Sequence, residues 1–348
     1  MRLLRVPALL ASLVASACSS LPPGGTPIIV DDVTTDVVVP RDVVDAGAPS
    51  DVPTDLGAPS DEPAVTDLGA LDAGPPDTGS ANDTGPAADV PVSGSIAMAL
   101  PVIDDATRAR VRAIRALGQT MGVRANVFAK IGDSITESGS FLSDIGEGWY
   151  ELGAYGAVEP TIQFFRAQTV GGGRNSFNRA SVCATAGWTA ARALEGGTSS
   201  PLRNELAATR PGYAVVMYGT NDIDQATPDA LQTNLTRILE IIEANGTVPI
   251  VSTIPDRTDA SRAGALALTM NERIRAIAAA RHIPLMDYWA ALQPLPGKGL
   301  DGDGIHPNVY RDGGDPQAGN FTAAGLRFGY NMRNLIAVLS LDRVRAIQ

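Results

Sequence analysis

The chain is poor in cysteine, histidine and aromatic side chains. Among its 348 residues there are only two cysteines and two histidines. Two thiols cannot form a disulfide framework or a cysteine-based zinc site. Any chemistry that needs an imidazole must therefore use His282 or His306. Aromatic residues are absent before Phe128, so the first part of the chain has no large ring around which to build a core.

The negative charge of the chain is concentrated in one segment. The formal net charge is −11, and residues 19–95 hold 14 acidic residues against a single base, Arg41. The same segment contains 12 of the 25 prolines and no Phe, Trp or Tyr. Such a composition cannot bury enough apolar surface to offset the entropy that is lost on ordering. We therefore predict that residues 19–95 form a disordered acidic linker rich in Asp, Pro and Ala.

Residues 1–18 have the composition of a secretory signal peptide. Two arginines precede an apolar run from Val6 to Val14, which is too short to span a bilayer. The run leads into Ala-Ser-Ala-Cys18, which resembles the cleavage site of bacterial lipoproteins, where the new N-terminal cysteine is lipidated. This resemblance implies a lipid anchor at Cys18, contact with a membrane and a place in the cell envelope. Ordinary cleavage near the same position, which would release a secreted protein, stays open.

The remaining residues, 96–348, are electrically balanced and long enough for one large domain. They contain 24 acidic and 24 basic residues. A neutral domain without a block of Lys and Arg argues against nucleic-acid binding. We expect the domain to act as a monomer.

Short apolar runs alternate with helical patterns in this domain. Strands are predicted at 126–131, 179–184, 212–218, 248–253 and 283–287, and helices at about 104–120, 227–246, 260–280 and 322–339. This alternation favours an α/β domain with a parallel sheet of about five strands and helices on both faces. Binding and catalytic sites in such sheets form at the carboxyl ends of the strands.

A candidate acid–base pair lies in the loop before the last predicted helix. His306 follows Asp303 by three residues, which lets the carboxylate reach the imidazole Nδ1–H and fix its tautomer. The other ring nitrogen is then able to take a proton from a hydroxyl group. His282 lies instead at a predicted helix end, where the helix dipole favours it and no chemistry is needed.

A candidate nucleophile follows the first predicted strand. Ser134 lies in a Gly-Asp-Ser turn, where a strand-to-helix connection exposes Oγ and directs backbone N–H groups towards an oxyanion. Asn221, in the segment Gly-Thr-Asn-Asp, follows the third predicted strand in the same way. Either segment alone is a weak signal, but together with Asp303 and His306, in this order, they form a specific pattern.

With these segments in place, residues 125–340 resemble the SGNH hydrolases, also called the GDSL esterase/lipase family. The resemblance implies a flavodoxin-like, three-layer α/β/α fold. It also implies that Ser134 is the nucleophile, His306 the base and Asp303 the group that orients it. The oxyanion hole would consist of the backbone N–H groups of Ser134 and Gly187 and the side-chain amide of Asn221.

Three assignments have alternatives at this point. The interval from Ser134 to Gly187 is long for the family, so the range 171–173, which is all glycine, competes with Gly187. Asp301 could replace Asp303. The aromatic residues of the interval 137–178 would either line a substrate cleft or pack as an extra layer on the sheet.

The resemblance implies a serine esterase that forms an acyl-enzyme without a metal or cofactor. We expect short acyl groups on a small-molecule or polysaccharide ester. Within the enzyme class, the alternative is a lipase or thioesterase that acts on longer acyl chains. Outside it, the alternative is a non-catalytic binding module tethered to the cell surface.

Overall fold

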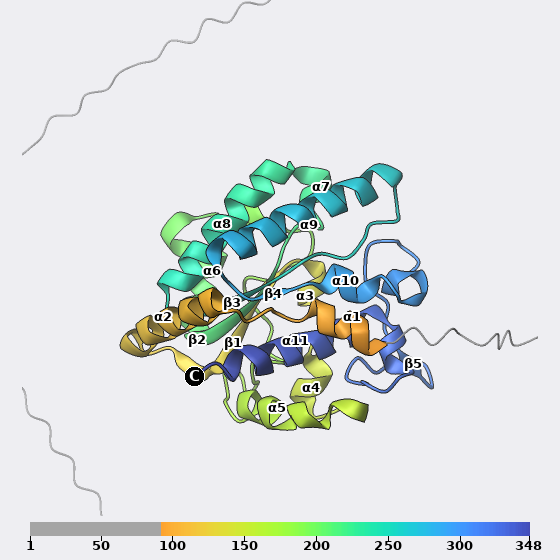
Figure 1. Ribbon diagram of the computed structural model, residues 1–348, viewed down its shortest axis with the longest axis horizontal. Coiled ribbons are helices and arrows are strands. Elements are labelled where there is room, and N and C mark those ends of the chain that lie inside the picture. The colour runs from red at the N-terminus through yellow and green to blue at the C-terminus, as the bar shows by residue number, and fades with distance from the viewer. Residues whose placement is uncertain (1–91) are drawn as a thin grey trace, which may run out of the picture. The chain divides into compact units, whose positions relative to one another are not determined.

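The computed structural model describes residues 92–348 (Figure 1). The predicted signal peptide, Cys18 and residues 19–91 of the predicted linker lie outside the described residues. The described part begins with helix α1 (Val92–Ala99), slightly before the expected start of the domain at residue 96. None of its helices combines the length and the apolar character that crossing a bilayer requires.

The described residues form a central parallel sheet with helices around it. The strands of the sheet are β1 (Arg124–Gly132), β2 (Pro211–Met217), β3 (Val248–Ser252) and β4 (Leu285–Met286). The longer helices are α2 (Asp105–Met121), α5 (Glu159–Arg166), α6 (Pro201–Thr209), α8 (Pro228–Ala244), α9 (Ser261–Arg281) and α11 (Gly329–Arg345). The shorter helices are α3 (Ser134–Glu137), α4 (Ser143–Glu147), α7 (Asp222–Gln225) and α10 (Tyr288–Leu292). A hairpin pairs β5 (Arg311–Asp312) with β6 (Asp315–Pro316), and 3₁₀ turns cover Gly153–Val158, Ala190–Leu194, Gly197–Ser199, Pro296–Gly299 and Gly325–Arg327.

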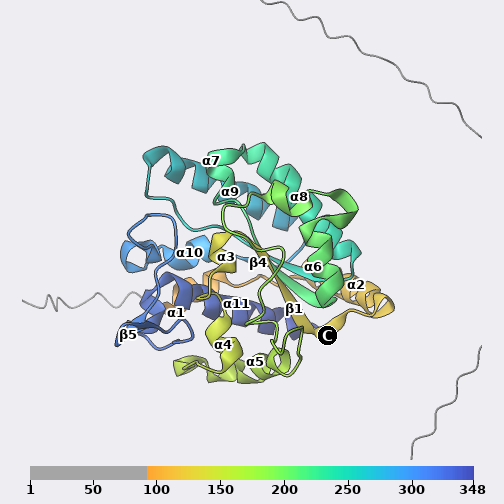
Figure 2. The same ribbon diagram turned by 180° about the vertical axis from the view of Figure 1, so that it is seen from behind.

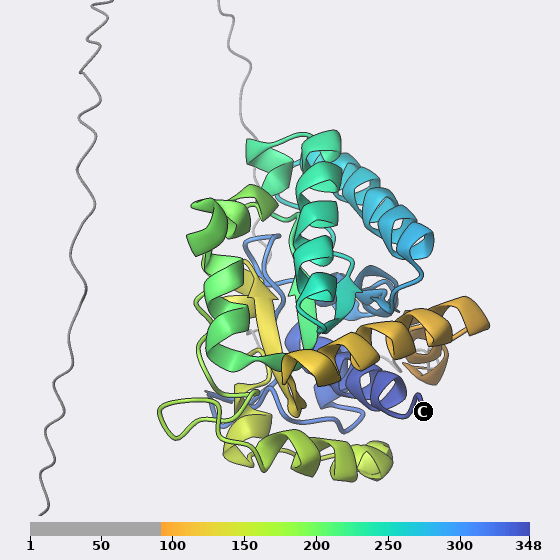
Figure 3. The ribbon, with the colours of Figure 1, turned by 90° about the vertical axis from the view of Figure 1, so that its left-hand side faces the viewer.

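The sheet has the order β1-β2-β3-β4, and every pairing is parallel. All residues of β2 and β3 are buried, as expected when helices cover both faces of a parallel sheet. Helices α6, α8 and α9 lie on one side of the sheet, and α5 and α11 lie on the other (Figures 1 and 3). The predicted three-layer α/β/α class is therefore confirmed.

The predicted strand at 179–184 is reduced to a single parallel bridge between Gly132 and Ala184. The physical reason is that a backbone donor of the segment is used elsewhere. The N–H of Val182 donates to the carboxylate of Glu205 at 3.0 Å and so does not take part in a ladder. The segment still lies beside β1, so β1 has neighbours on both edges.

The position of this segment defines where a site can form. After β1 the chain first runs to the segment 179–184, which lies at one edge of β1, and then crosses to β2, which lies at the other edge of β1. Such a change of direction is a topological switch point, where the loops after neighbouring strands separate and leave room for a ligand. The carboxyl end of β1 is that point in this domain.

Helix α2 matches the helix predicted at about 104–120, but fewer apolar side chains are buried in its last turn than their helical spacing suggests. The Asp104 side chain accepts the N–H of Thr107 at 2.7 Å, and Gly122 ends the helix in the left-handed conformation. Leu117 and Met121, which continue the helical spacing of the buried Val111 and Ile114, are 41% and 48% exposed. The last turn of α2 therefore extends past the core.

The last helix begins later than predicted, at Gly329 instead of Thr322. The side chain of Asn320 accepts hydrogen bonds from the N–H and the hydroxyl of Thr322, at 3.0 and 2.6 Å. The interruption lies at Phe328, whose extended backbone (φ −114°, ψ 145°) separates the 3₁₀ turn Gly325–Arg327 from α11. The prediction of a helix start at Thr322 was therefore wrong by two turns.

Most aromatic residues of the interval 137–178 pack as an extra layer. The rings of Phe165 and Phe177 meet the ring of Phe128 edge-on, with centroids 5.2 and 4.9 Å apart. Of the two alternatives for this interval, packing against the sheet is the one these rings adopt. Trp149 is the exception, because its side chain is 70% exposed.

A buried ion pair holds the segment beside β1, which leads to a stability prediction. Glu205 is fully buried and accepts hydrogen bonds from Arg179 at 2.6 and 3.1 Å. Glu205→Ala leaves this guanidinium without its carboxylate, so we expect the free energy of unfolding to fall by about 3 kcal/mol in a urea titration. The control is the ion pair Arg192–Glu195, in which each of the two side chains is 55% exposed. Glu195→Ala should cost less than about 1 kcal/mol, and equal losses would contradict the prediction.

Candidate active site

Ser134, His306 and Asp303 form one continuous series of close contacts. Ser134 is the first residue of α3, directly after β1, and its Oγ lies 2.9 Å from Nε2 of His306. On the other side of the ring, Nδ1 lies 2.6 Å from Oδ2 of Asp303. With its proton on Nδ1, the imidazole donates to the carboxylate and accepts from the serine hydroxyl. The structure therefore brings together the three residues predicted as a triad.

The second carboxylate oxygen of Asp303 fixes the loop that carries the histidine. It accepts the backbone N–H groups of Ile305 and His306, both at 2.9 Å. Partial burial acts to raise the pKa of Asp303, but these hydrogen bonds and the one from the imidazole outweigh it and hold the pKa below its usual value. The carboxylate is thus ionised at neutral pH, as a partner for an imidazolium must be.

Asp301, the alternative to Asp303, has a different position. Its carboxylate accepts the N–H of Gly302 at 2.8 Å, and its own N–H donates to the carbonyl oxygen of His306, also at 2.8 Å. These contacts close the loop through the backbone. Asp303, and not Asp301, is the carboxylate that contacts the imidazole.

The loop after β3 supports the histidine loop at Gly304. This glycine has a φ of 69°, and the N–H of Thr258 donates to its carbonyl oxygen at 2.9 Å. A Cβ at this position would lie 2.7 Å from Thr258 Oγ1 and 2.8 Å from the Asp259 nitrogen. Only glycine satisfies both the left-handed backbone and the close approach.

Arg257 connects the same loop to the segment that carries Asn221. Its side chain is 4% exposed and forms two 2.7 Å hydrogen bonds with Asp259. It also donates to the carbonyl oxygen of Thr220 at 3.0 Å and to Asp224 at 2.9 Å. The sequence analysis missed this residue, although it too lies in a polar stretch after a predicted strand, which was the signal that identified Asn221.

Gly187 lies in a loop that is attached to both α3 and the start of α7. The N–H of Ala186 donates to Glu137 on α3 at 2.7 Å. The amide Nδ2 of Asn221 donates to the carbonyl oxygen of Trp188 at 3.1 Å. An amide NH₂ has two hydrogens, so this bond leaves Asn221 a second donor. Gly187 itself has a φ of 77°, a conformation that glycine adopts without strain.

The other predicted alternatives lie away from Ser134. The glycines at 171–173 follow Thr169, whose carbonyl oxygen accepts Arg124 Nη1 at 3.3 Å. Arg124 is the first residue of β1, so this turn is at the opposite end of the strand from Ser134. His282 is an exposed residue that ends α9 with a φ of 53°, as its assignment to a helix end predicted.

Arg333 of α11 is a fully buried cation that holds the first turn of α3. It donates to the carbonyl oxygen of Ile135 at 2.6 Å and to Thr136 Oγ1 at 2.8 Å. Its guanidinium also lies 3.7 Å from the ring centroid of Phe141. The sequence analysis missed this residue too, although an arginine inside an otherwise apolar helix pattern was a visible signal.

Two buried carboxyl groups are sequence neighbours of predicted site residues: Asp133 directly precedes Ser134, and Asp222 directly follows Asn221. Asp133 caps α3 by accepting the N–H of Ile135 at 3.1 Å. Burial raises the pKa of Asp133 to about 6, and the guanidinium of Arg333 opposes part of that rise. Burial likewise raises the pKa of Asp222 to about 6, although its carboxylate accepts the N–H of Ala190 at 3.2 Å.

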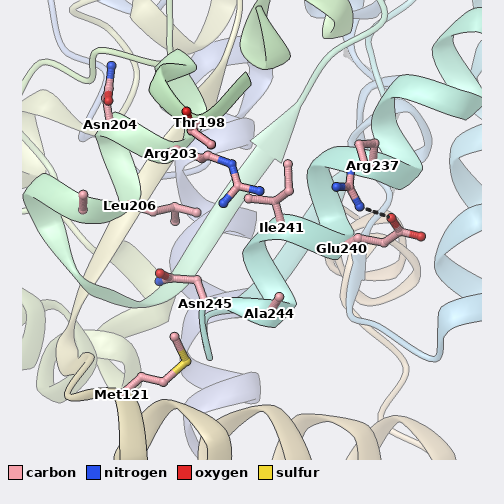
Figure 4. A pocket seen from close by; sticks show the side chains of 11 residues that line it. Met121, Thr198, Arg203, Asn204, Leu206, Arg237, Glu240, Ile241, Ala244 and Asn245 are labelled. Carbon is pink, nitrogen blue, oxygen red and sulfur yellow. Dashed lines mark hydrogen bonds and ion pairs between the residues drawn. The ribbon is translucent and has the colours of Figure 1, made fainter. Parts of the chain in front are cut away.

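A surface pocket of about 450 Å³ lies between α6 and α8 (Figure 4). Its lining includes Met121, Arg203 and Ile241, and none of the predicted catalytic residues. Arg237 and Glu240 bond to each other at 3.0 Å on its rim. Within residues 92–348 no group of three or more His, Cys, Asp and Glu side chains is arranged to hold a metal ion.

The raised pKa of Asp133 leads to a prediction about stability and pH. Because its folded-state pKa is above the usual 3.8, the native state binds the proton more tightly than the unfolded state. Its contribution to stability is therefore present at low pH and is lost as the pH rises towards 6. Asp133→Asn removes this titration, while the amide oxygen can still accept the N–H of Ile135. We measure the free energy of unfolding of both proteins in urea titrations at pH 4 and pH 7.5. The value for the variant minus the value for the wild type should be about 2 kcal/mol larger at pH 7.5 than at pH 4. The same difference at both pH values would contradict the assignment.

Several solved structures are similar to the chain at low identity. A GDSL-like lipase from Bacteroides thetaiotaomicron is 17% identical, with 68% of this chain and 98% of that chain covered and a TM-score of 0.37. A lipase/acylhydrolase from Enterococcus faecalis is 17% identical, with coverages of 62% and 95% and a TM-score of 0.41. A carbohydrate esterase family 3 protein from Talaromyces cellulolyticus is 17% identical, with coverages of 62% and 98% and a TM-score of 0.42. No curated protein matches the sequence.

A family model also matches the sequence. The GDSL-like Lipase/Acylhydrolase family matches residues 131–310, which is more than half of the chain. The match includes Ser134, Asn221 and His306, the residues on which the sequence prediction was based. The chain therefore belongs to the GDSL-like lipase/acylhydrolase family, a family of ester hydrolases.

Proposed function

We propose that the domain is a serine esterase in which Ser134 is the nucleophile, His306 the general base and Asp303 the group that orients the imidazole. The observation that carries this proposal is the unbroken series of contacts from the carboxylate through the ring to the hydroxyl, at 2.6 and 2.9 Å. A serine hydroxyl is a poor nucleophile without such a base.

The reaction follows from this arrangement. Oγ of Ser134 forms a bond with the ester carbonyl carbon as its proton passes to Nε2 of His306, and Asp303 stabilises the resulting imidazolium. The tetrahedral intermediate then collapses, the bond to the alcohol oxygen breaks, and the alcohol takes the proton from Nε2. A water molecule repeats these steps on the acyl-enzyme, which releases the acid and restores the serine.

The oxyanion of the intermediate requires fixed donors. We assign this role to the backbone N–H groups of Ser134 and Gly187 and to the side-chain amide of Asn221. Supporting this assignment, the hydrogen bonds of Ala186 to α3 and of Asn221 to Trp188 join the three donor segments. Donors that are already fixed need no reorganisation when charge develops.

The surroundings of the site favour a short acyl group on a large alcohol. The side chains of His306 and Asp303 are 41% and 47% exposed, so a bulky or polymeric alcohol can extend from Ser134 into solvent. The apolar residues that follow Ser134 and Asn221, Ile135 and Ile223, are buried, and Glu137 is exposed, so a long acyl chain finds little apolar surface beside the serine. Because each buried CH₂ contributes about 0.8 kcal/mol, long chains gain little here. We therefore propose O-acetyl esters, including those of polysaccharides, as the substrate class.

Hydrolysis of p-nitrophenyl esters from acetate to palmitate by the full-length protein tests both parts of the proposal. We expect kcat/KM to be highest for the shortest acyl groups and Ser134→Ala to abolish turnover without changing the urea unfolding curve. A kcat/KM that rises with chain length would favour the lipase alternative. Equal rates for the variant and the wild type would contradict the assignment of Ser134 as the nucleophile, and no turnover by the wild type would favour the non-catalytic binding module.

A matched pair of loop variants tests the role of Asp303. Asp303→Asn removes the charge that contacts the imidazole, and we expect kcat to fall by about 10³-fold or more. Asp301→Asn removes an equal charge two positions away in the same loop and should keep kcat within about twofold. The reverse order of the two effects would show that Asp301 is the orienting group.

We also propose that the mature protein is attached to a membrane through a lipid on Cys18, with the segment 19–95 as a tether. The motif at residues 15–18 and the apolar run before it support this location. The mass of the N-terminal peptide of the mature protein should show a diacylglyceryl group on Cys18. An unmodified N-terminus would instead indicate ordinary secretion.

A further inference from the structure

Trp149 is a large apolar side chain that the domain leaves in solvent. It follows α4, and 70% of its surface is exposed. It lines a pocket of about 310 Å³, together with the polar side chains of Glu151, Gln317 and Asn320. Tyr150 also lines the pocket, which therefore combines aromatic side chains with carboxylate and amide groups.

This combination matches the chemistry of a sugar ring. A pyranose has a face of C–H groups that packs on an indole, and hydroxyl groups around its edge that pair with carboxylates and amides. We propose that the Trp149 pocket binds one sugar unit of a polysaccharide and thereby holds an esterified chain within reach of Ser134. The inference deepens the proposed function and rests on it for the identity of the substrate.

The charge of the pocket narrows the class of polysaccharide. Asp144 and Glu151 contribute carboxyl groups to its lining, and no Lys or Arg is among the residues that line it. A chain of acidic sugars would meet like charge without a compensating cation. The pocket is therefore suited to neutral sugars.

The walls of the pocket are held in place by backbone hydrogen bonds between two segments. The N–H of Glu151 donates to the carbonyl oxygen of Gly319 at 3.0 Å, and the N–H of Phe321 donates to that of Glu151 at 2.7 Å. The N–H of Trp149 donates to the carbonyl oxygen of Asp144 at 2.8 Å. A pocket with fixed walls does not need to be ordered when its ligand binds.

Helix α11 connects this pocket to the nucleophile. Asn331 donates to the carbonyl oxygens of Gln317 and Asn320 at 2.8 and 2.9 Å, and Arg333 donates to that of Ile135, next to Ser134. Side chains two residues apart on a helix point to nearly opposite faces, so Asn331 and Arg333 hold loops on the two sides of α11. Figures 1 and 2 both show α4 and α3 on opposite sides of α11. A polymer bound at Trp149 then has to extend across the width of one helix, about 10 Å, to reach Ser134, and binding there raises the local concentration of its ester groups.

The kinetic test compares a polymeric with a small substrate, using the full-length protein. With O-acetylated xylan or O-acetylated glucomannan, Trp149→Ala should lower kcat/KM by about tenfold, mainly through a higher KM. With p-nitrophenyl acetate, which is too small to reach the pocket, kcat/KM should stay within about twofold. Leu268→Ala is the matched control, because Leu268 is 44% exposed on α9 and lines neither site.

A binding measurement separates this inference from the proposed esterase activity. In affinity gel electrophoresis through deacetylated xylan or glucomannan, the wild type should be retarded and Trp149→Ala should not. This result would support the pocket even if Ser134→Ala retained full activity and the esterase proposal failed. Equal mobility and unchanged polymer kinetics for Trp149→Ala with both polysaccharides would overturn the inference. An equal loss of activity on the polymer and on p-nitrophenyl acetate would also overturn it, since a sugar subsite cannot affect the small ester.

Discussion

The polar side chains that α11 buries hold the carboxyl edge of the domain together. Arg333, Asn331 and Asn334 are fully buried on one helix, where polar groups without partners would be costly. Each instead bonds to loop backbone: Arg333 to the turn after Ser134, Asn331 to the carbonyl oxygens of the Trp149 pocket, and Asn334 to the carbonyl oxygens of Ser140 and Ala318. Loops that lack regular secondary structure thereby gain fixed positions. Ser134 and the Trp149 pocket depend on the same helix for their geometry.

Asp303 and Asp133 have environments that shift their pKa values in opposite directions, and the two groups therefore suit different roles. Asp303 is partly exposed and receives three hydrogen bonds, so its pKa is lowered and it carries charge at neutral pH. Asp133 is buried, one of its oxygens has no partner, and burial raises its pKa to about 6. The first arrangement suits a group that must stabilise an imidazolium, and the second suits a helix cap that contributes most to stability when protonated.

Local patterns predicted much of this domain. Apolar runs located β1, β2 and β3, and the rule that sites follow strands identified Ser134 and Asn221 before any contact was known. The failures have a common cause, which is a partner far away in the sequence. The predicted strand at 179–184 gave a backbone donor to Glu205, and Arg257 and Arg333 bond to loops that spacing alone cannot connect with them. The late start of α11 is the one exception to this cause, because the extended backbone of Phe328 interrupts the helix locally.

The contact between Ser134 and His306 joins residues that are 172 positions apart. Closing a loop of that size carries an entropic cost that only the assembled sheet and its helices can offset. The loop between them includes β2, β3 and β4, so the hydroxyl meets its base only when nearly the whole domain has folded. A partly folded chain therefore has Ser134 without its proposed base. Esterase activity would then report on the integrity of the complete domain.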